Sequence, residues 1–367
     1  MHFKRFIILI IIFFYGFSNY AQIFQKEISG LGTEIDYGYG FITPHHKSIE
    51  YFVEDHIQTF DIKLNYASYG TKYWNQLFRY PNYGFGFYRA NLGNREVYGY
   101  VNALYSYVKV PVIGQWETIN LSWQIGFGAS YLTQHFDIKE NPQNLAIGTN
   151  LNIYVDFSLQ SQIRLSKLMN LTNNVRFTHF SNGKVKSPNK GLNVLSGSVG
   201  VLYHFNEPTE KYQLKLPEIK NKNEYTVIYA GGIKTKSRYE SGYYYASSLI
   251  MDYYRNYSLK RRWGFGTDLF YDETKRQFSD KNQKSNVINS DLYQVGLHVG
   301  HEMVMGNMAL TINVGGYLYA PVEEEAPIYS RIGIRYRFAE KYIANLTLKS
   351  HWAIASYIEW GVGYAFK

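Results

Sequence analysis

The chain has 367 residues, a formal net charge of +9 and no cysteine. We therefore expect neither a disulfide framework nor a lipid-anchored N-terminus. The positive charge would suit nucleic acid or anionic lipid head groups, but no nucleic-acid-binding motif accompanies it. The 37 tyrosines, 23 phenylalanines and mean hydropathy of −0.31 are instead typical of a transmembrane β-barrel, in which half of each strand faces water.

Residues 1–21 are expected to form a secretory signal peptide. Lys4 and Arg5 precede a short apolar run at residues 6–14, and Ala21 is a small residue suited to cleavage. The run is too short for a membrane-spanning helix, which needs roughly 20 apolar residues. Removal of Lys4 and Arg5 subtracts two charges from the formal net charge of +9 and leaves +7. The sequence therefore predicts export from the cytoplasm.

Apolar and polar residues alternate with a period of two along several segments of the exported chain. Clear examples are residues 120–131, 151–160 and 328–338. The segments run for about 10–14 residues, which exceeds the usual 5–6 of soluble sheets and suits tilted membrane strands. Aromatic residues gather near their ends, as in the interfacial girdles of membrane barrels. The pattern predicts an all-β, transmembrane, antiparallel β-barrel in the outer membrane of a Gram-negative bacterium.

A polar stretch at residues 206–223, which contains Pro208 and Pro217, interrupts this pattern. About eight strand-like segments precede the stretch and about eight follow it. Because periplasmic turns of membrane barrels are short, such a stretch is unusual within one continuous barrel. We predict two tandem eight-stranded barrels, with one sixteen-stranded barrel as the alternative. The expected domains are a first barrel at residues 22–205, a periplasmic linker at 206–223 and a second barrel-forming half at 224–367.

A hairpin near the end of the first half carries polar residues on its apolar face. Val175 and Phe177 are expected to face lipid. The period of two places His179 and Ser181 on that same face, and it places Asn193 there on the returning strand. With a periplasmic N-terminus the seventh strand rises, so its upper end lies in the outer leaflet. Polar groups in lipid are costly unless they are partnered.

A histidine beside a serine can activate the hydroxyl for attack on an acyl ester of a lipid that stays in the membrane. Residues two apart on a strand lie about 7 Å apart at Cα, so the side chains of His179 and Ser181 can come within hydrogen-bond reach. The alternative interpretation is that these two residues only anchor the strand in the head-group zone. Spacing by itself leaves both interpretations open.

The same segment resembles the PagL-like lipid A 3-O-deacylases, which are grouped with the acyloxyacyl hydrolases. Their signature is His-x-Ser-Asn, then Pro-Asn in the loop, then a polar or acidic residue at the start of the last strand. The detailed likeness covers roughly the last 35 residues of the first half. The matching residues are His179, Ser181, Asn182, Gly183, Pro188, Asn189 and Asn193.

The resemblance implies that Ser181 is the nucleophile and His179 the general base. Better-known members place a glutamate where this chain has Asn193, as the group that orients the histidine. The amide oxygen of Asn193 can still accept from the imidazole N–H, but it cannot stabilise the imidazolium with a full charge. Donors to the oxyanion are expected, by side chain or backbone, from Asn182, Gly183 and Asn189.

Three lysines lie in the same loop. They are expected either to solvate an extracellular loop or to contact lipid A phosphates next to the scissile ester. These residues are Lys184, Lys186 and Lys190. Elsewhere, His45 and His46 follow Pro44 and are expected to lie in a loop.

The second half is expected to form a barrel without the catalytic set. His351 would point into the lumen, and Ala353 stands at the position equivalent to the serine. Three arginines alternate with apolar residues on one lumenal face. They could line an anion-selective pore, or they could pair with acids such as Glu359. These are Arg331, Arg335 and Arg337.

The sequence thus predicts an outer-membrane esterase that hydrolyses an ester-linked acyl chain of lipid A by a Ser-His mechanism. Its expected partner is lipopolysaccharide, through lipid A in the outer leaflet, and not nucleic acid. No metal site and no cofactor are expected, since no metal-binding or phosphate-loop motif is present. The alternative function is a non-catalytic structural barrel or a small anion pore.

Overall fold

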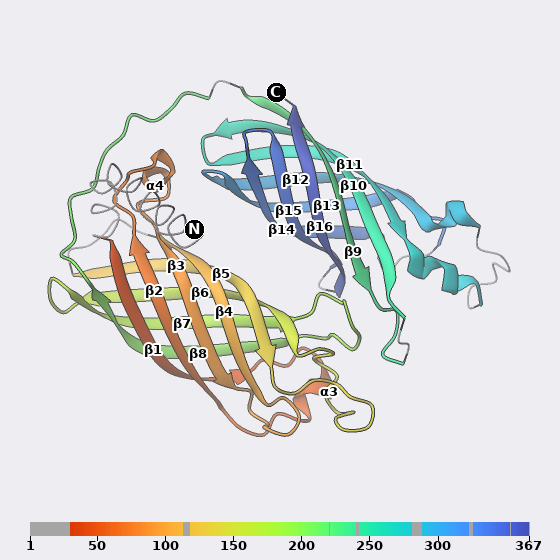
Figure 1. Ribbon diagram of the computed structural model, residues 1–367, viewed down its shortest axis with the longest axis horizontal. Helices are drawn as coiled ribbons and strands as arrows, with labels where there is room; N and C mark the ends of the chain where they lie inside the picture. The colour runs from red at the N-terminus through yellow and green to blue at the C-terminus, as the bar shows by residue number, and fades with distance from the viewer. Residues whose placement is uncertain are drawn as a thin grey trace, which may run out of the picture.

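The chain folds into two closed, antiparallel, eight-stranded barrels that follow one another in sequence (Figure 1). This arrangement confirms the predicted tandem barrels and rules out the single sixteen-stranded alternative. The computed structural model describes residues 30–112, 118–219, 221–239, 242–280, 288–322, 326–352 and 354–366. The predicted signal peptide and Ala353 lie outside these residues. Within them, no helix has the length and apolar character needed to cross a membrane.

Each strand of the first barrel pairs with the next along the chain, and the pairing of the first strand with the eighth closes the cylinder. Its strands are β1 Leu31–Ile42, β2 Ile57–Ala67, β3 Asn82–Asn91, β4 Tyr100–Pro111, β5 Ile119–Leu132, β6 Leu151–Arg164, β7 Met169–Ser181 and β8 Leu192–His204. Among the described residues, two short α-helices accompany these strands, α3 Lys47–Glu50 and α4 Tyr73–Leu77.

The second barrel repeats this topology and closes between its first and last strands. Its strands are β9 Asn223–Lys234, β10 Tyr244–Ser258, β11 Arg261–Asp272, β12 Tyr293–Met305, β13 Met308–Tyr319, β14 Ile328–Phe338, β15 Tyr342–His351 and β16 Ile354–Phe366. Two 3₁₀ helices, η1 Glu273–Asp280 and η2 Asn289–Leu292, lie between β11 and β12.

Alternation of apolar and polar side chains explains why these segments form barrel walls. Along β7, Val175 is 60% exposed and faces outward, whereas Arg176 is 3% exposed and faces the lumen. Apolar side chains at alternate positions suit lipid, and the polar ones between them find partners inside. The predicted segments 120–131 and 151–160 fall within β5 and β6, which extend beyond them.

Ion pairs occupy the lumen of the first barrel. The Lys63 ammonium lies 2.5 Å from Glu34 and 2.8 Å from Asp36, and the Arg176 guanidinium lies 2.5 Å from Asp61. All five side chains are buried. Because a buried charge without a partner costs several kcal/mol, these pairs keep the interior compatible with a narrow, filled barrel.

The lumen of the second barrel is filled in the same way. Arg331 is fully buried and lies 2.6 Å from Glu359 and 3.2 Å from Asp268. Arg335 pairs with acids of β10 and β12, each at 2.8 Å. Arg337 pairs with Glu224. The three arginines therefore pair internally, which is the second of the two predicted outcomes.

Contacts join the two barrels at both ends of the strands. At the end that carries α4, the Lys260 ammonium donates to the Leu77 carbonyl at 3.3 Å, and Phe78 packs in one cluster with Met305. At the other end, the loop after β7 contacts the residue that follows β9. The two barrels thus touch through their rims.

The chain between β8 and β9 contains no strand or helix at residues 205–219 and 221–222. It runs along the edge of the molecule from one barrel to the other (Figure 1). Its middle contacts the first barrel, because the Tyr212 N–H donates to the Tyr69 carbonyl at 2.7 Å and the Tyr80 hydroxyl donates to the Tyr212 carbonyl at 3.1 Å.

Candidate active site

The predicted site residues lie on the outer face of the β7–β8 hairpin. Val175 and Phe177 of β7 are exposed at the outer surface, and the alternation of the strand places His179 and Ser181 on that face. His179 is partly buried and Ser181 is 8% exposed, because the loops at this rim cover them. On β8, Asn193 is paired in register with His179.

A hydrogen bond joins His179 to Asn193. The Nδ1–H of His179 donates to Oδ1 of Asn193 at 2.6 Å. This bond leaves Nε2 of the imidazole as the nitrogen that can accept a proton. Among the described residues, Ser181 and His179 form no hydrogen bond with one another. Catalytic hydrogen bonds are often long or absent without substrate and form in the complex.

His45, which sequence reasoning placed only in a loop, also reaches the site. Its Nδ1 accepts from the Nδ2–H of Asn193 at 3.1 Å, and its Nε2–H donates to the Lys190 carbonyl at 2.8 Å. The Thr43 N–H donates to the Asn193 carbonyl at 2.9 Å and holds the segment in place. Nothing in the local pattern around His45 signals this contact, because its partner lies 148 residues away along the chain.

Gly191 makes room for the imidazole. Its φ of +78° lies in the left-handed region, and a Cβ built on it would stand 2.6 Å from Cε1 of His179. A side chain at this position would be strained and would also displace the ring. Gly191 is further held by its N–H, which donates to the Ala146 carbonyl at 2.9 Å.

The loop between β7 and β8 is tied together by Asn182. The Asn182 N–H donates to Oδ1 of Asn189 at 2.9 Å, and its side-chain amide donates to the Lys186 carbonyl at 2.8 Å. The side-chain amide also donates to Oγ1 of Thr149 at 3.1 Å, so the backbone N–H and the side-chain amide of Asn182 are both engaged within the first barrel. Gly183 follows with a φ of +61°, and no acceptor among the described residues is bonded to its N–H. Among the described residues, Asn189 is bonded only through its Oδ1, so the N–H groups of Gly183 and Asn189 are the expected oxyanion donors that are left available.

The three loop lysines differ in their surroundings. The Lys190 ammonium donates to Oγ of Ser48 at 2.8 Å and lies 2.9 Å from the ring nitrogens of His46. Burial, together with the charge of Arg238 from the second barrel, lowers the pKa of Lys190. Lys184 has a φ of +69°, and Lys184 and Lys186 lie in the part of the loop that Asn182 closes.

Comparison with family models identifies both halves of the chain. Residues 58–201 match the model described as lipid A 3-O-deacylase (PagL), and residues 223–367 match the model described as acyloxyacyl hydrolase, C-terminal domain. The chain belongs to the lipid A 3-O-deacylase (PagL) family. It is accordingly a carboxylic ester hydrolase of the outer membrane of a Gram-negative bacterium. The candidate site lies within the part that matches the PagL model.

The likeness to solved structures is weak. The outer-membrane enzyme PagL is 14% identical, with a TM-score of 0.34 over 46% of this chain and 97% of that chain. Neisserial surface protein A is 11% identical, with a TM-score of 0.32 over 48% of this chain and 98% of that chain. A porin of Rhodopseudomonas blastica is 9% identical, with a TM-score of 0.17 over 92% of this chain and 99% of that chain. No curated protein matches the chain. Membership of the PagL family therefore rests on the family models.

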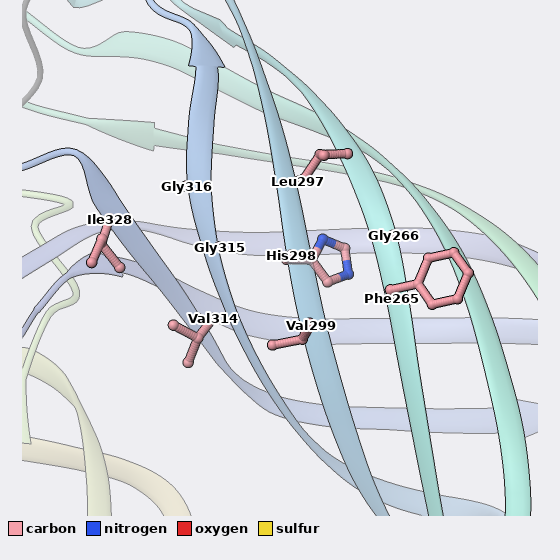
Figure 2. A pocket seen from close by; sticks show the side chains of 9 residues that line it. All are labelled: Phe265, Gly266, Leu297, His298, Val299, Val314, Gly315, Gly316 and Ile328. Atoms are coloured by element: carbon pink, nitrogen blue, oxygen red, sulfur yellow. The ribbon is translucent and has the colours of Figure 1, made fainter.

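An apolar groove of about 430 Å³ lies on the outer surface of the second barrel (Figure 2). It is lined by Phe265, Gly266, Leu297, His298, Val299, Val314, Gly315, Gly316 and Ile328. The nitrogens of the His298 ring are engaged in the lumen, where they lie 2.7 Å from Asp268 and 2.8 Å from Asp252. The groove contains none of the predicted site residues, which lie on the first barrel.

Proposed function

We propose that this protein hydrolyses an ester-linked acyl chain of lipid A, with Ser181 as nucleophile and His179 as general base. The observation that carries the proposal is the bond between Nδ1 of His179 and Oδ1 of Asn193 on the outer face of the β7–β8 hairpin. That bond gives the imidazole a free Nε2, which the general base requires. The location at the outer surface suits a substrate whose acyl chains remain in the bilayer.

The reaction would proceed in two steps. Nε2 of His179 takes the Ser181 proton while Oγ of Ser181 bonds to the acyl carbonyl carbon. The resulting oxyanion accepts a hydrogen bond from the Gly183 N–H. The C–O bond to the sugar then breaks, and the imidazolium returns its proton to the sugar oxygen, which leaves an acyl-serine. Water, deprotonated by His179, attacks this ester and releases the fatty acid with the Ser181 hydroxyl restored.

Asn193 would orient His179 but would not neutralise the imidazolium. A neutral amide gives less stabilisation to the protonated base than a carboxylate would. We therefore expect slower turnover than in a member of the family with glutamate at this position. Lys184 and Lys186 are proposed to contact the phosphates of lipid A, and Asn182 and Asn189 to hold the loop that presents the Gly183 N–H.

Mass spectrometry of lipid A tests the proposal. Cells that make the wild-type protein should carry lipid A with one acyl chain fewer, and cells that make Ser181→Ala should resemble cells without the protein. Ser106→Ala is a matched control, because Ser106 is an exposed residue on the outer face of β4. The control should behave as wild type. Equal deacylation by Ser181→Ala and wild type would show that Ser181 is not the nucleophile.

A further inference from the structure

An Asn side chain that orients a histidine must itself be oriented. The amide of Asn193 has an oxygen on one side and an NH₂ group on the other, and a rotation exchanges the two. Only one orientation presents the oxygen to the Nδ1–H of His179. In the other, the NH₂ group would face Nδ1, the ring proton would move to Nε2, and Nε2 could no longer accept the Ser181 proton.

His45 selects the orientation of the Asn193 amide in which the oxygen faces His179. Its Nε2 lies 2.8 Å from the Lys190 carbonyl, and because a carbonyl can only accept, this nitrogen carries the ring proton. Nδ1 of neutral His45 is then an acceptor, and it receives the NH₂ group of Asn193 at 3.1 Å. The oxygen of Asn193 is thereby left for His179, at 2.6 Å. The bonds run in one direction from His179 to Lys190.

We propose that His45 is a positioning residue for the base of the hydrolase: it fixes the amide of Asn193 so that Asn193 can orient His179. This inference rests on the proposed function. It also explains how a neutral amide can stand where related proteins place a glutamate. A carboxylate has two equivalent oxygens and needs no partner to choose between them.

Four variants compared with wild type test this role: His45→Ala, His45→Gln, Asn193→Glu and the double variant His45→Ala with Asn193→Glu. Purified proteins in detergent are assayed for fatty acid released from lipopolysaccharide, and kcat and KM are measured separately. We expect His45→Ala to lower kcat roughly tenfold, as loss of an outer orienting partner does, with little change in KM. In the Asn193→Glu background the same substitution should change kcat less than about twofold.

His45→Gln keeps an acceptor and a donor on the side chain, so its kcat should stay within about threefold of wild type. The proposal would be overturned if His45→Ala lowered kcat equally with Asn193 and with Asn193→Glu, or if it did not lower kcat in the protein that keeps Asn193. Ser181→Ala serves as the blank in each background. If Ser181→Ala were active, the proposed function itself would fail, which is a different result from a failure of the His45 cycle. Heat-modifiable migration on gels verifies that each barrel is folded.

A separate observation concerns the second barrel, whose rim contacts the loop that carries Gly183. The Ser187 N–H donates to Oγ1 of Thr235 at 2.7 Å, and the Thr235 N–H donates to the Lys184 carbonyl at 3.3 Å. Thr235 directly follows β9 and is 2% exposed. One threonine therefore bonds the loop on both sides of Val185.

The outer face of β16 completes this contact. Trp360 and Val362 on that face are 64% and 67% exposed, but Ile358 is only 8% exposed. The Gly183 backbone covers it, since a Cβ built on Gly183 would lie 2.4 Å from Cγ1 of Ile358. A residue on an outer barrel face is thus buried against Gly183, whose N–H is the proposed oxyanion donor.

We infer that the second barrel positions the oxyanion loop of the first, through Thr235 and Ile358. This inference also rests on the proposed function and gives the C-terminal half a part in catalysis without a catalytic residue of its own. Because the contacts act on the backbone at residues 183–187, they should affect stabilisation of the oxyanion more than substrate binding.

The test uses the full chain with Thr235→Val and Ile358→Ala. Each is expected to lower kcat about three- to tenfold, the range for loss of one net hydrogen bond or its equivalent in packing, with KM unchanged. Thr267→Val and Ile332→Ala, on the outer face of the second barrel away from this loop, are matched controls and should leave kcat as in wild type. If kcat of Thr235→Val and Ile358→Ala equals that of the controls, the inference fails. Inactive Ser181→Ala separates this result from failure of the proposed function.

Discussion

The imidazole of His179 occupies the space that a side chain at position 191 would need. Gly191 combines a positive φ with a close approach to Cε1 of His179, so both its conformation and its lack of a side chain matter. Within β8, which begins directly after Gly191, a Cβ on Gly197 would meet only the Asn174 carbonyl, at 3.9 Å. Gly191 and Gly197 are therefore not equivalent.

We predict that Gly191→Ala lowers kcat by about a hundredfold, because displacement of a catalytic group by about 1 Å has effects of that size. The barrel should still assemble, since position 191 lies at the rim. Gly197→Ala is the control and should retain wild-type kcat. Deacylase kinetics on purified, folded proteins decide the matter, and a fully active Gly191→Ala would show that the His179 ring need not occupy its observed position.

Lys186 offers a test of head-group recognition at the same scale. If its ammonium contacts a lipid A phosphate, Lys186→Gln should raise KM about two- to fivefold, as expected for a solvent-exposed ion pair. The increase should disappear with dephosphorylated lipid A. Lys139→Gln, in another exposed loop of the first barrel, should leave KM unchanged. A KM increase that persists without phosphate would contradict the assigned contact.

The β7–β8 hairpin shows what alternation can and cannot reveal. The period of two predicts which residues share the outer face, and the structure places His179 and Ser181 there with Val175 and Phe177. The period of two also predicts the strand positions closely, because burial of one face and lipid contact of the other fix the register in which neighbouring strands pair. The roles of these residues stay predictions.

Contacts between distant loops could not be predicted in this way. His45 meets Asn193 only because closure of the first barrel brings β1 beside β8. Likewise, the contact of Thr235 with Ser187 depends on how the two barrels lie together, which strand periodicity does not encode. The sequence shows which hydrogen-bonding groups His45 and Thr235 offer, but the closed fold determines which residues they contact.

Position 175 tests the lipid-facing side of the hairpin. Val175 lies near the middle of β7 and is 60% exposed on the outer face. Val175→Lys should lower the free energy of unfolding in a bilayer by roughly 2–4 kcal/mol, and Leu165→Lys, at the turn before β7, by about 0–1 kcal/mol. Urea titration of the barrel in lipid vesicles measures both. Equal effects at the two positions would contradict the placement of Val175 deeper in the bilayer than Leu165.

At the scale of the whole molecule, two narrow barrels with paired charges inside stand side by side. Arg331 is fully buried, and its partners Glu359 and Asp268 belong to two other strands, β16 and β11. Side chains that close the lumen in this way do not favour the alternative of an anion pore. The pairs instead join strands across the interior.

Removal of the Arg331 charge should destabilise the second barrel. We predict that Arg331→Met lowers its free energy of unfolding by about 3–5 kcal/mol, because Glu359 is left buried without a cationic partner and Asp268 keeps only His298. Unfolding in denaturant measures the change, and Arg337→Met, whose side chain is 21% exposed, should cost less. If Arg331→Met instead left the stability unchanged and altered ion conductance in planar bilayers, the pore interpretation would regain support.

The segment between β8 and β9 means that the two barrels never have to find one another by diffusion in the membrane. A short tether gives its ends an effective concentration in the mM range, so even a weak rim contact stays occupied. A handful of bonds such as those of Thr235 can then suffice where separate proteins would need a large interface. Dilution of the protein among lipids should leave its turnover per molecule constant.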